Sequence, residues 1–95
     1  MIPSGPTLGV TESQRRGFLS VQVERARQDA KWGVQYHSVI EWLAILNEEQ
    51  GELAQQCLRS HFGNVVSPEL RAEAVQVAAV ALAFIEAIDE RRIRR

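Results

Sequence analysis

The chain has 95 residues, and its 11 basic and 12 acidic side chains give a net charge of -1. A chain of this length forms one domain that buries only about 60–65% of its unfolded surface, so a second subunit would help to complete its core. The balanced charge excludes an electrostatic grip on nucleic acid or on an anionic membrane surface.

Cysteine usage and hydropathy favour a soluble intracellular protein. Cys57 is the only cysteine, which excludes an intrachain disulfide and is typical of a reducing compartment. The longest apolar run, residues 77–85, is far shorter than the roughly 20 residues that span a bilayer. The N-terminus has no basic segment followed by an apolar one, so we expect no signal peptide and a cytoplasmic protein.

The first third of the chain predicts an arm, a helix and a loop. Residues 1–10 are rich in proline and glycine and predict a flexible arm, followed by a single domain over residues 11–95. A capping box at residues 11–14 predicts a helix to about Ala30, weakened at Gly17. The residues expected to face inward from it are Phe18, Val21 and Val23. Residues 31–37 predict a loop.

Residues 38–58 predict the central helix, which Ser38 and Glu41 begin as a capping box. Its apolar residues recur at helical spacing and define a stripe expected to face the core, namely Val39, Leu43, Leu46, Gln50, Leu53, Ala54 and Cys57. A second stripe lies between this apolar stripe and the opposite side of the helix, which is expected to face solvent. It consists of Trp42, Ile45, Glu49, Glu52 and Gln56. Its two carboxylates share a face with Trp42, so they need a cation or hydrogen-bond donors to stay ionised.

A third helix is predicted from Pro68 to about Arg92, with Ser67 as its N-cap and Gly63 as the end of the preceding helix. Residues 74–88 are apolar nearly all round, which predicts that they are covered on every side. The rest of the chain is too short to cover them, so we expect a dimer or a larger assembly. No segment has a strand pattern, and we expect an all-α fold.

The third helix also carries a polar stripe. Four residues lie within about 60° of one another on a helical wheel, namely Glu69, Glu73, Gln76 and Val80. If this stripe packs against Glu49 and Glu52, three carboxylates and an amide oxygen meet in a small volume. Such hard oxygen ligands suit Mg²⁺ or Mn²⁺, which also bind substrate phosphates. The bland alternatives are a solvated glutamate pair and an amide, Gln76, that bridges two packed helices.

These motifs resemble those of a known family. Glu49-Gln50-Gly51-Glu52 is followed by Leu53-Ala54, and the next helix carries Glu73-Ala74-Val75-Gln76. Upstream stand Glu24-Arg25 and Gln35-Tyr36-His37. Over residues 21–88 the chain resembles the MazG-like all-α nucleoside triphosphate pyrophosphohydrolases, which carry E-x-x-E and E-x-x-D on successive helices. It is similar to the dCTP pyrophosphatase branch, with its E-R and Q-[FY]-H, and to phage-encoded members that handle purine deoxynucleotides.

The resemblance implies an antiparallel helical bundle, completed by dimerisation or tetramerisation, and an enzyme of the cytoplasm or of a host's cytoplasm. It would cleave a (deoxy)nucleoside triphosphate between the α- and β-phosphates, with a preference for purines such as dGTP or dATP. Its catalytic metal ligands would be Glu49, Glu52 and Glu73. Gln76, at the position where the family has Asp, would be a further ligand. Glu48, beside the first ligand, would be another, although the helical period puts it nearer the solvent. The substrate-binding residues would be Lys31, Trp32, Gln35 and His37.

Several alternatives stay open at this point. Because an amide carries no charge, Gln76 leaves the number of metal ions undecided. Trp32 and Trp42 can be core or interface fillers, and His37 a hydrogen-bonding loop residue. The role of holding the β- and γ-phosphates has two candidates, namely Lys31 and an arginine of a neighbouring subunit such as Arg91 or Arg92. The rival function is a non-catalytic helical dimer that binds a nucleotide or a partner protein.

Overall fold

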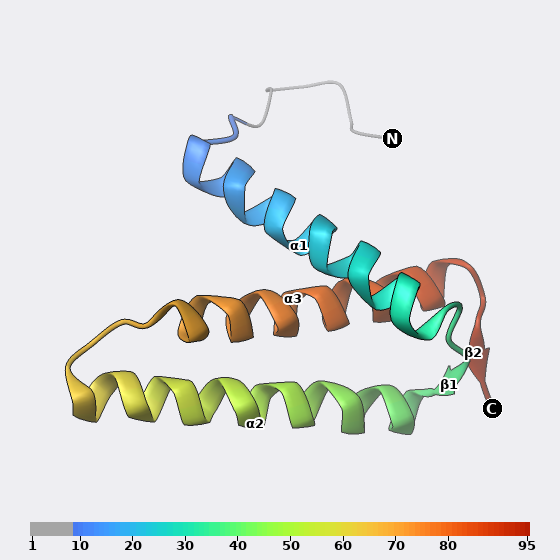
Figure 1. Ribbon diagram of the computed structural model, residues 1–95. Coiled ribbons are helices and arrows are strands. Elements are labelled where there is room, and N and C mark those ends of the chain that lie inside the picture. The colour runs from blue at the N-terminus through green and yellow to red at the C-terminus, as the bar shows by residue number, and fades with distance from the viewer. Residues whose placement is uncertain (1–8) are drawn as a thin grey trace.

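Three helices make up most of the structure, a computed structural model that describes residues 9–95. They are α1 (Glu12–Trp32), α2 (Val39–Gly63) and α3 (Pro68–Asp89); a two-residue strand, β1 (His37–Ser38), precedes α2, and another, β2 (Ile93–Arg94), follows α3. α2 and α3 lie side by side and antiparallel, and α1 crosses α3 obliquely (Figure 1). The all-α prediction is confirmed for these residues; most of the predicted arm, residues 1–8, lies outside the described part of the chain.

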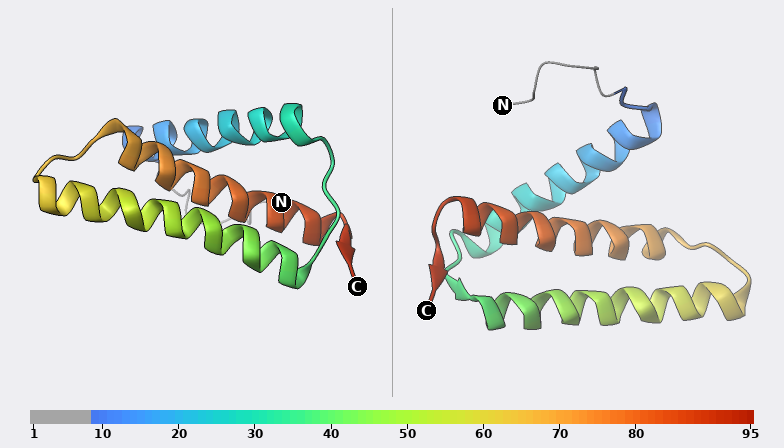
Figure 2. Two further views of the ribbon diagram at one scale, coloured as in Figure 1. Left: turned by 60° about the horizontal axis from the view of Figure 1, so that its bottom comes forward. Right: turned by 180° about the vertical axis from the view of Figure 1, so that it is seen from behind.

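The α3 helix lies between the other two: α2 runs along it, whereas α1 approaches it near its own C-terminal end and diverges from it towards its start (Figure 2). All three helices begin where their capping residues predict. Thr11 and Gln14 form the capping box of α1, and Ser38 and Glu41 form that of α2. Ser67 caps α3 by accepting a hydrogen bond from the backbone of Leu70. Within residues 9–95, none of the helices is long and apolar enough to cross a membrane.

The C-terminal ends of α1 and α2 differ from their predicted positions. α1 continues to Trp32, so Lys31 and Trp32 are helical and the loop begins at Gly33, which has a φ of 67°. In α2 the left-handed residue is Asn64, with a φ of 53°, and Gly63 is still helical. An asparagine tolerates this conformation, so it replaces the glycine that the sequence pattern favours.

The prediction that α3 runs to Arg92 is wrong, because the helix ends at Asp89. Arg91 adopts a left-handed φ of 56°, and the backbone N–H of Arg92 donates to the Ala87 carbonyl at 2.7 Å. The reversed chain forms β2, which pairs in parallel with β1. The expectation of no strands is therefore also corrected. It failed because two residues are too few to show the alternating pattern by which a strand is recognised in a sequence.

The core lies between α2 and α3 and is small. Trp42 of α2 is 2% exposed and packs against Val80, Ala83 and Ala87 of α3. The ring of Phe84 stacks on the indole, with the two centroids 5.4 Å apart. Trp42 therefore fills the core, which was one of the two roles left open for it.

The prediction that one apolar stripe faces the core is confirmed for Leu46, which packs against it, and is wrong for several other members in the single chain. Val39 and Leu43 are 56% and 50% exposed, and Cys57 is exposed too. The stripe of Trp42 and Ile45 faces α3 instead. Helical periodicity identifies faces of a helix but not which face meets which neighbour, and the largest apolar side chain, Trp42, lies on the second stripe.

The inward face of α1 is polar, which corrects the expectation for Phe18 and Val23. These two side chains are 65% and 50% exposed, whereas Glu24, Arg25 and Gln28 are buried. Burial of these polar groups is possible because they are hydrogen-bonded. Val21 is half-buried, as expected.

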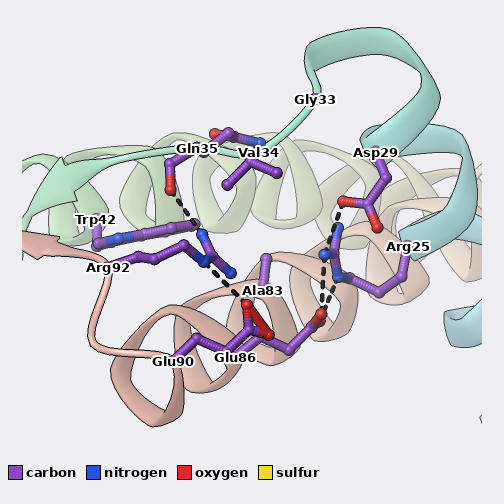
Figure 3. Close-up of a pocket in the computed structure, with 10 residues that line it drawn as sticks. All are labelled: Arg25, Asp29, Gly33, Val34, Gln35, Trp42, Ala83, Glu86, Glu90 and Arg92. Atoms are coloured by element: carbon purple, nitrogen blue, oxygen red, sulfur yellow. Dashed lines mark hydrogen bonds and ion pairs between the residues drawn. The ribbon is translucent and has the colours of Figure 1, made fainter.

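Arg25 is the centre of this polar network, which ties α1 to α3 (Figure 3). Its guanidinium donates to Glu86 at 2.6 and 3.2 Å and to Asp29 at 2.9 Å. The hydrogen bond to Glu86 is the main reason why the pKa of Arg25 is raised, although burial opposes the shift. A fixed charge network thus takes the place of apolar packing between these two helices.

Candidate functional site

Three carboxylates from two helices meet where α2 and α3 face each other. Glu49 and Glu52 stand one turn apart on α2, and Glu73 comes from the first half of α3. Each offers a carboxylate oxygen, and these oxygens all lie within 4.8 Å of one another. The sequence-based expectation that the two polar stripes pack together describes this arrangement.

Two of these carboxylates each have one oxygen that is removed from water without gaining a partner. The Oε2 atoms of Glu49 and Glu73 are buried and accept no hydrogen bond from any residue within 9–95. A buried ionised oxygen without a donor or a cation is costly. The alternative of a solvated pair, Glu49 and Glu52, therefore does not fit Glu49, which is half-buried, although it fits Glu52, which is exposed.

The electrostatics of the cluster are unfavourable for three ionised groups. Burial, followed by the charges of Glu52, Glu73, Glu48 and Glu24, raises the pKa of Glu49. Burial, the charge of Glu52 and a hydrogen bond with Glu52 raise the pKa of Glu73. Either a proton or a cation relieves this repulsion.

A cavity of about 590 Å³ adjoins the cluster. It lies where the end of α1, the segment before β1, α2 and α3 come together, and Glu49 belongs to both the cluster and the cavity wall. Gln76 and Glu48 also line it; Gln76 is half-buried and Glu48 is exposed. Gln76 therefore lies beside the three carboxylates, one turn after Glu73 on α3.

Three of the four predicted substrate-binding residues line this cavity, namely Trp32, Gln35 and His37. The ring Nε2 of His37 lies 2.7 Å from Gln35 Oε1, and the imidazole meets the Trp42 indole edge to face at 5.0 Å between centroids. Lys31 is not among the lining residues, and its Nζ lies 4.7 Å from the centroid of the Trp32 ring.

Arg92 has a different role from the one considered for it. Its Nη1 donates to the backbone carbonyl of Gln35 at 2.7 Å, and its Nε pairs with Glu90 at 3.0 Å (Figure 3). The side chain is 15% exposed. These contacts direct Arg92 to its own chain, where it holds the segment that carries Gln35.

Sequence reasoning missed the contribution of α1 to the cavity. Gln28, 3% exposed, lines the cavity beside Trp32, which follows it by one helical turn. Tyr36 lines it as well. The i, i+4 spacing of Gln28 and Trp32 was the available signal, but a polar residue on a helix is expected to face solvent.

Comparison of the chain with protein-family models, with curated proteins and with solved structures gives no match.

Proposed function

We propose that this protein is a metal-dependent (deoxy)nucleoside triphosphate pyrophosphohydrolase that releases a nucleoside monophosphate and pyrophosphate. The observation that carries the proposal is the pair of buried, unpartnered carboxylate oxygens of Glu49 and Glu73, which lie beside a cavity with aromatic walls. The resemblance of the two glutamate motifs to the MazG-like family supports the same reaction. Neither observation depends on the other.

The donor set suits a hard divalent cation. Glu49, Glu52 and Glu73 would hold Mg²⁺ or Mn²⁺, with the amide oxygen of Gln76 and the carboxylate of Glu48 as further oxygen ligands. When bound, the cation polarises a phosphoryl oxygen and lowers the pKa of a bound water. The negative charge of the cluster, which is unfavourable without a cation, then becomes the source of its affinity.

The chain's own groups supply the remaining steps. Trp32, 57% exposed at the cavity, offers a face on which a nucleobase can stack. A carboxylate of the cluster takes the proton from the attacking water. The oxygen of that water forms a bond to the α-phosphorus, the bond to the bridging oxygen breaks, and pyrophosphate leaves.

We further propose that the enzyme is a homodimer or homotetramer. Large apolar side chains are half or more exposed along α2, including Leu43 at 50%, Leu58 at 58% and Phe62 at 80%. On α3, Ile85 and Ile88 are 53% and 52% exposed. Apolar surface of this extent on a small chain is typical of a subunit interface. The single thiol, Cys57, suits the reducing cytoplasm.

The proposal is tested by incubating the purified protein with Mg²⁺ and each of the eight common NTPs and dNTPs. Release of pyrophosphate from at least one of them supports it, and release of orthophosphate alone would mean that a different bond is cut. Glu49→Gln and Glu73→Gln should abolish turnover with the helical circular dichroism unchanged. Glu69→Gln, which changes an exposed carboxylate on α3, is the matched control and should retain activity.

The second candidate is a helical dimer that binds a nucleotide or a partner protein without turnover. Gln76 favours it, because an amide replaces the acidic residue that the resemblance calls for and lowers the charge available to metal ions. Binding of a triphosphate by isothermal titration calorimetry, with no product from any of the eight nucleotides, would establish this alternative.

A further inference from the structure

We propose that Gln28 of α1 selects the nucleobase, by donating a hydrogen bond to an oxo group at C6 of a purine or C4 of a pyrimidine. The protein would therefore favour oxo bases over amino bases. The inference rests on the proposed function, since it concerns the same cavity. Its argument comes from the orientation of one buried amide and from the polarity of the groups around it.

Gln28 is the most buried of the polar side chains on α1. It is 3% exposed and contributes to the cavity wall, together with Trp32 one turn later. A buried amide has two N–H donors and one oxygen, and each of these groups normally has a partner. The partners of Gln28 therefore reveal which of its groups is left for a ligand.

The orientation of this amide is determined by Arg25. The Nη1 of Arg25 donates to Gln28 Oε1 at 3.1 Å. A guanidinium can only donate, so the amide atom that faces it has to be the oxygen, and the usual ambiguity between the two ends of a glutamine is removed. Arg25 is itself held by Glu86 and Asp29, at 2.6 and 2.9 Å. The amide thus has a rigid support on its oxygen side.

The amide nitrogen of Gln28 remains available. Within residues 9–95, the one side-chain hydrogen bond of Gln28 is the one that its Oε1 accepts from Arg25, so its Nε2 donates to no other residue. It is not among the fully enclosed unpartnered atoms, and Gln28 lines the cavity, so we infer that its Nε2 faces the cavity. The group that this position offers to a ligand is therefore a donor and not an acceptor.

Gln35 of the same wall has a similar polarity. With the ring proton of His37 on Nε2, Gln35 Oε1 accepts that hydrogen bond and the amide N–H groups of Gln35 are left over. The indole Nε1 of Trp42 is a buried N–H without an acceptor in the described part of the chain. With that tautomer Gln35 therefore offers further donors at the cavity wall, whereas the enclosed N–H of Trp42 does not reach a ligand; Glu48 and Glu49 contribute carboxylates to the same wall.

Nucleobases differ in the group that they present to such a donor. Guanine and hypoxanthine carry an oxygen at C6, and uracil and thymine carry one at C4; adenine and cytosine carry amino groups at these positions. An amino group facing Gln28 places a donor against a donor and leaves both without a partner in a water-poor site. Sites built around a specific hydrogen bond discriminate strongly against a ligand that fails to make it.

Two substrate pairs test the inference on the unmodified protein. dITP carries an oxo group at C6 where dATP carries an amino group, and dUTP carries an oxo group at C4 where dCTP carries an amino group. In each pair the oxo member also has a proton on the neighbouring ring nitrogen. We expect kcat/KM for pyrophosphate release to favour the oxo member of at least the purine pair by about 10-fold or more. Equal values for both pairs, or a preference for the amino members, would overturn the proposal.

Substitutions then assign the preference to Gln28. Gln28→Met keeps the length of the side chain and removes the donors, so the oxo-to-amino ratio should fall to near 1; Gln28→Glu, which offers an acceptor, should invert it. Gln22→Met, on an exposed part of α1, is the control and should leave the ratio unchanged. An unchanged ratio in a folded Gln28→Met protein would refute the assignment to Gln28.

The outcome can be separated from that of the proposed function. If no triphosphate is turned over, the same pairs are compared by calorimetric binding to the wild-type protein, where the oxo member should still bind about 10-fold more tightly. Equal binding within both pairs would refute the selection by Gln28, whether or not pyrophosphate is released.

Discussion

Glu49 of α2 and Glu73 of α3 bring carboxylate oxygens within 4.8 Å of each other, and each keeps one buried oxygen without a hydrogen-bond partner in the described residues. Two half-buried carboxylates in this arrangement repel each other. A cluster that weakens the fold in this way is expected where a cation or a substrate compensates for it. The cavity beside this pair is lined in part by residues 34–37, the segment that connects α1 to α2.

The metal-free protein should lose stability from this cluster as the pH rises. The pKa values of Glu49 and Glu73 are raised in the folded state, so between the ordinary carboxyl pKa and the raised values the folded protein holds more protons than the unfolded one. The free energy of unfolding therefore falls as the pH rises through this window. In EDTA, Glu73→Gln should be more stable than wild type at pH 7, and the two should converge towards pH 4.

Other carboxyl groups act in the opposite direction, so only the difference between the two proteins is informative. The pKa of Glu41 is lowered to about 2, first by its hydrogen bond from the Ser38 backbone and then by Arg94. Its contribution is present above the ordinary carboxyl pKa and is lost as the pH falls towards 2. Subtracting the urea unfolding curves of Glu73→Gln from those of wild type cancels it. A difference that does not change between pH 4 and 7 would contradict the burial of Glu73.

How far the sequence predicts this site can be judged from particular residues. The spacing of Glu49 and Glu52 on one predicted helix, and the stripe of Glu73 and Gln76 on the next, were enough to expect their meeting. Helix starts were equally accessible, because Thr11, Ser38 and Ser67 bond to the backbone within a few residues. Local signals of this kind depend on short stretches of chain.

What the sequence does not reveal depends on contacts between distant segments. The buried role of Gln28 comes from Arg25, which is held by Glu86 on another helix. The turn at Arg91 and the pairing of β2 with β1 join the C-terminal segment to the residues that precede α2. Which stripe of α2 faces α3 is decided by packing, and periodicity alone cannot rank the stripes.

Arg92→Ala should loosen the cavity wall. The substitution removes the hydrogen bonds to the Gln35 carbonyl and to Glu90, and a lost hydrogen bond of a charged group costs about 1.5–3 kcal/mol. Amide hydrogen exchange should accelerate in residues 34–38, and KM for the triphosphate should rise more than kcat falls. Arg95→Ala, at the exposed C-terminus, is the control. Unchanged exchange in the loop would show that Arg92 does not hold it.

A charged residue on the exposed stripe of α2 should dissociate the assembly. Leu43 is 50% exposed in the single chain, and a glutamate there would be buried without a partner in a dimer. In sedimentation velocity experiments the wild type should be a dimer or tetramer and Leu43→Glu a smaller species. Gln55→Glu adds the same charge at an exposed position outside that stripe and should change nothing. A monomeric wild type at micromolar concentration would contradict the proposed oligomer.

The central claim, that carboxylates of α2 and α3 together bind a divalent cation, is tested most directly by Mn²⁺ titration. The electron paramagnetic resonance signal of free Mn²⁺ reports binding without any need for turnover. The account predicts saturable binding by wild type and by Glu69→Gln, and a loss of at least 10-fold in affinity for Glu49→Gln and for Glu73→Gln. Equal affinity in all four proteins, or no binding by wild type, would contradict it.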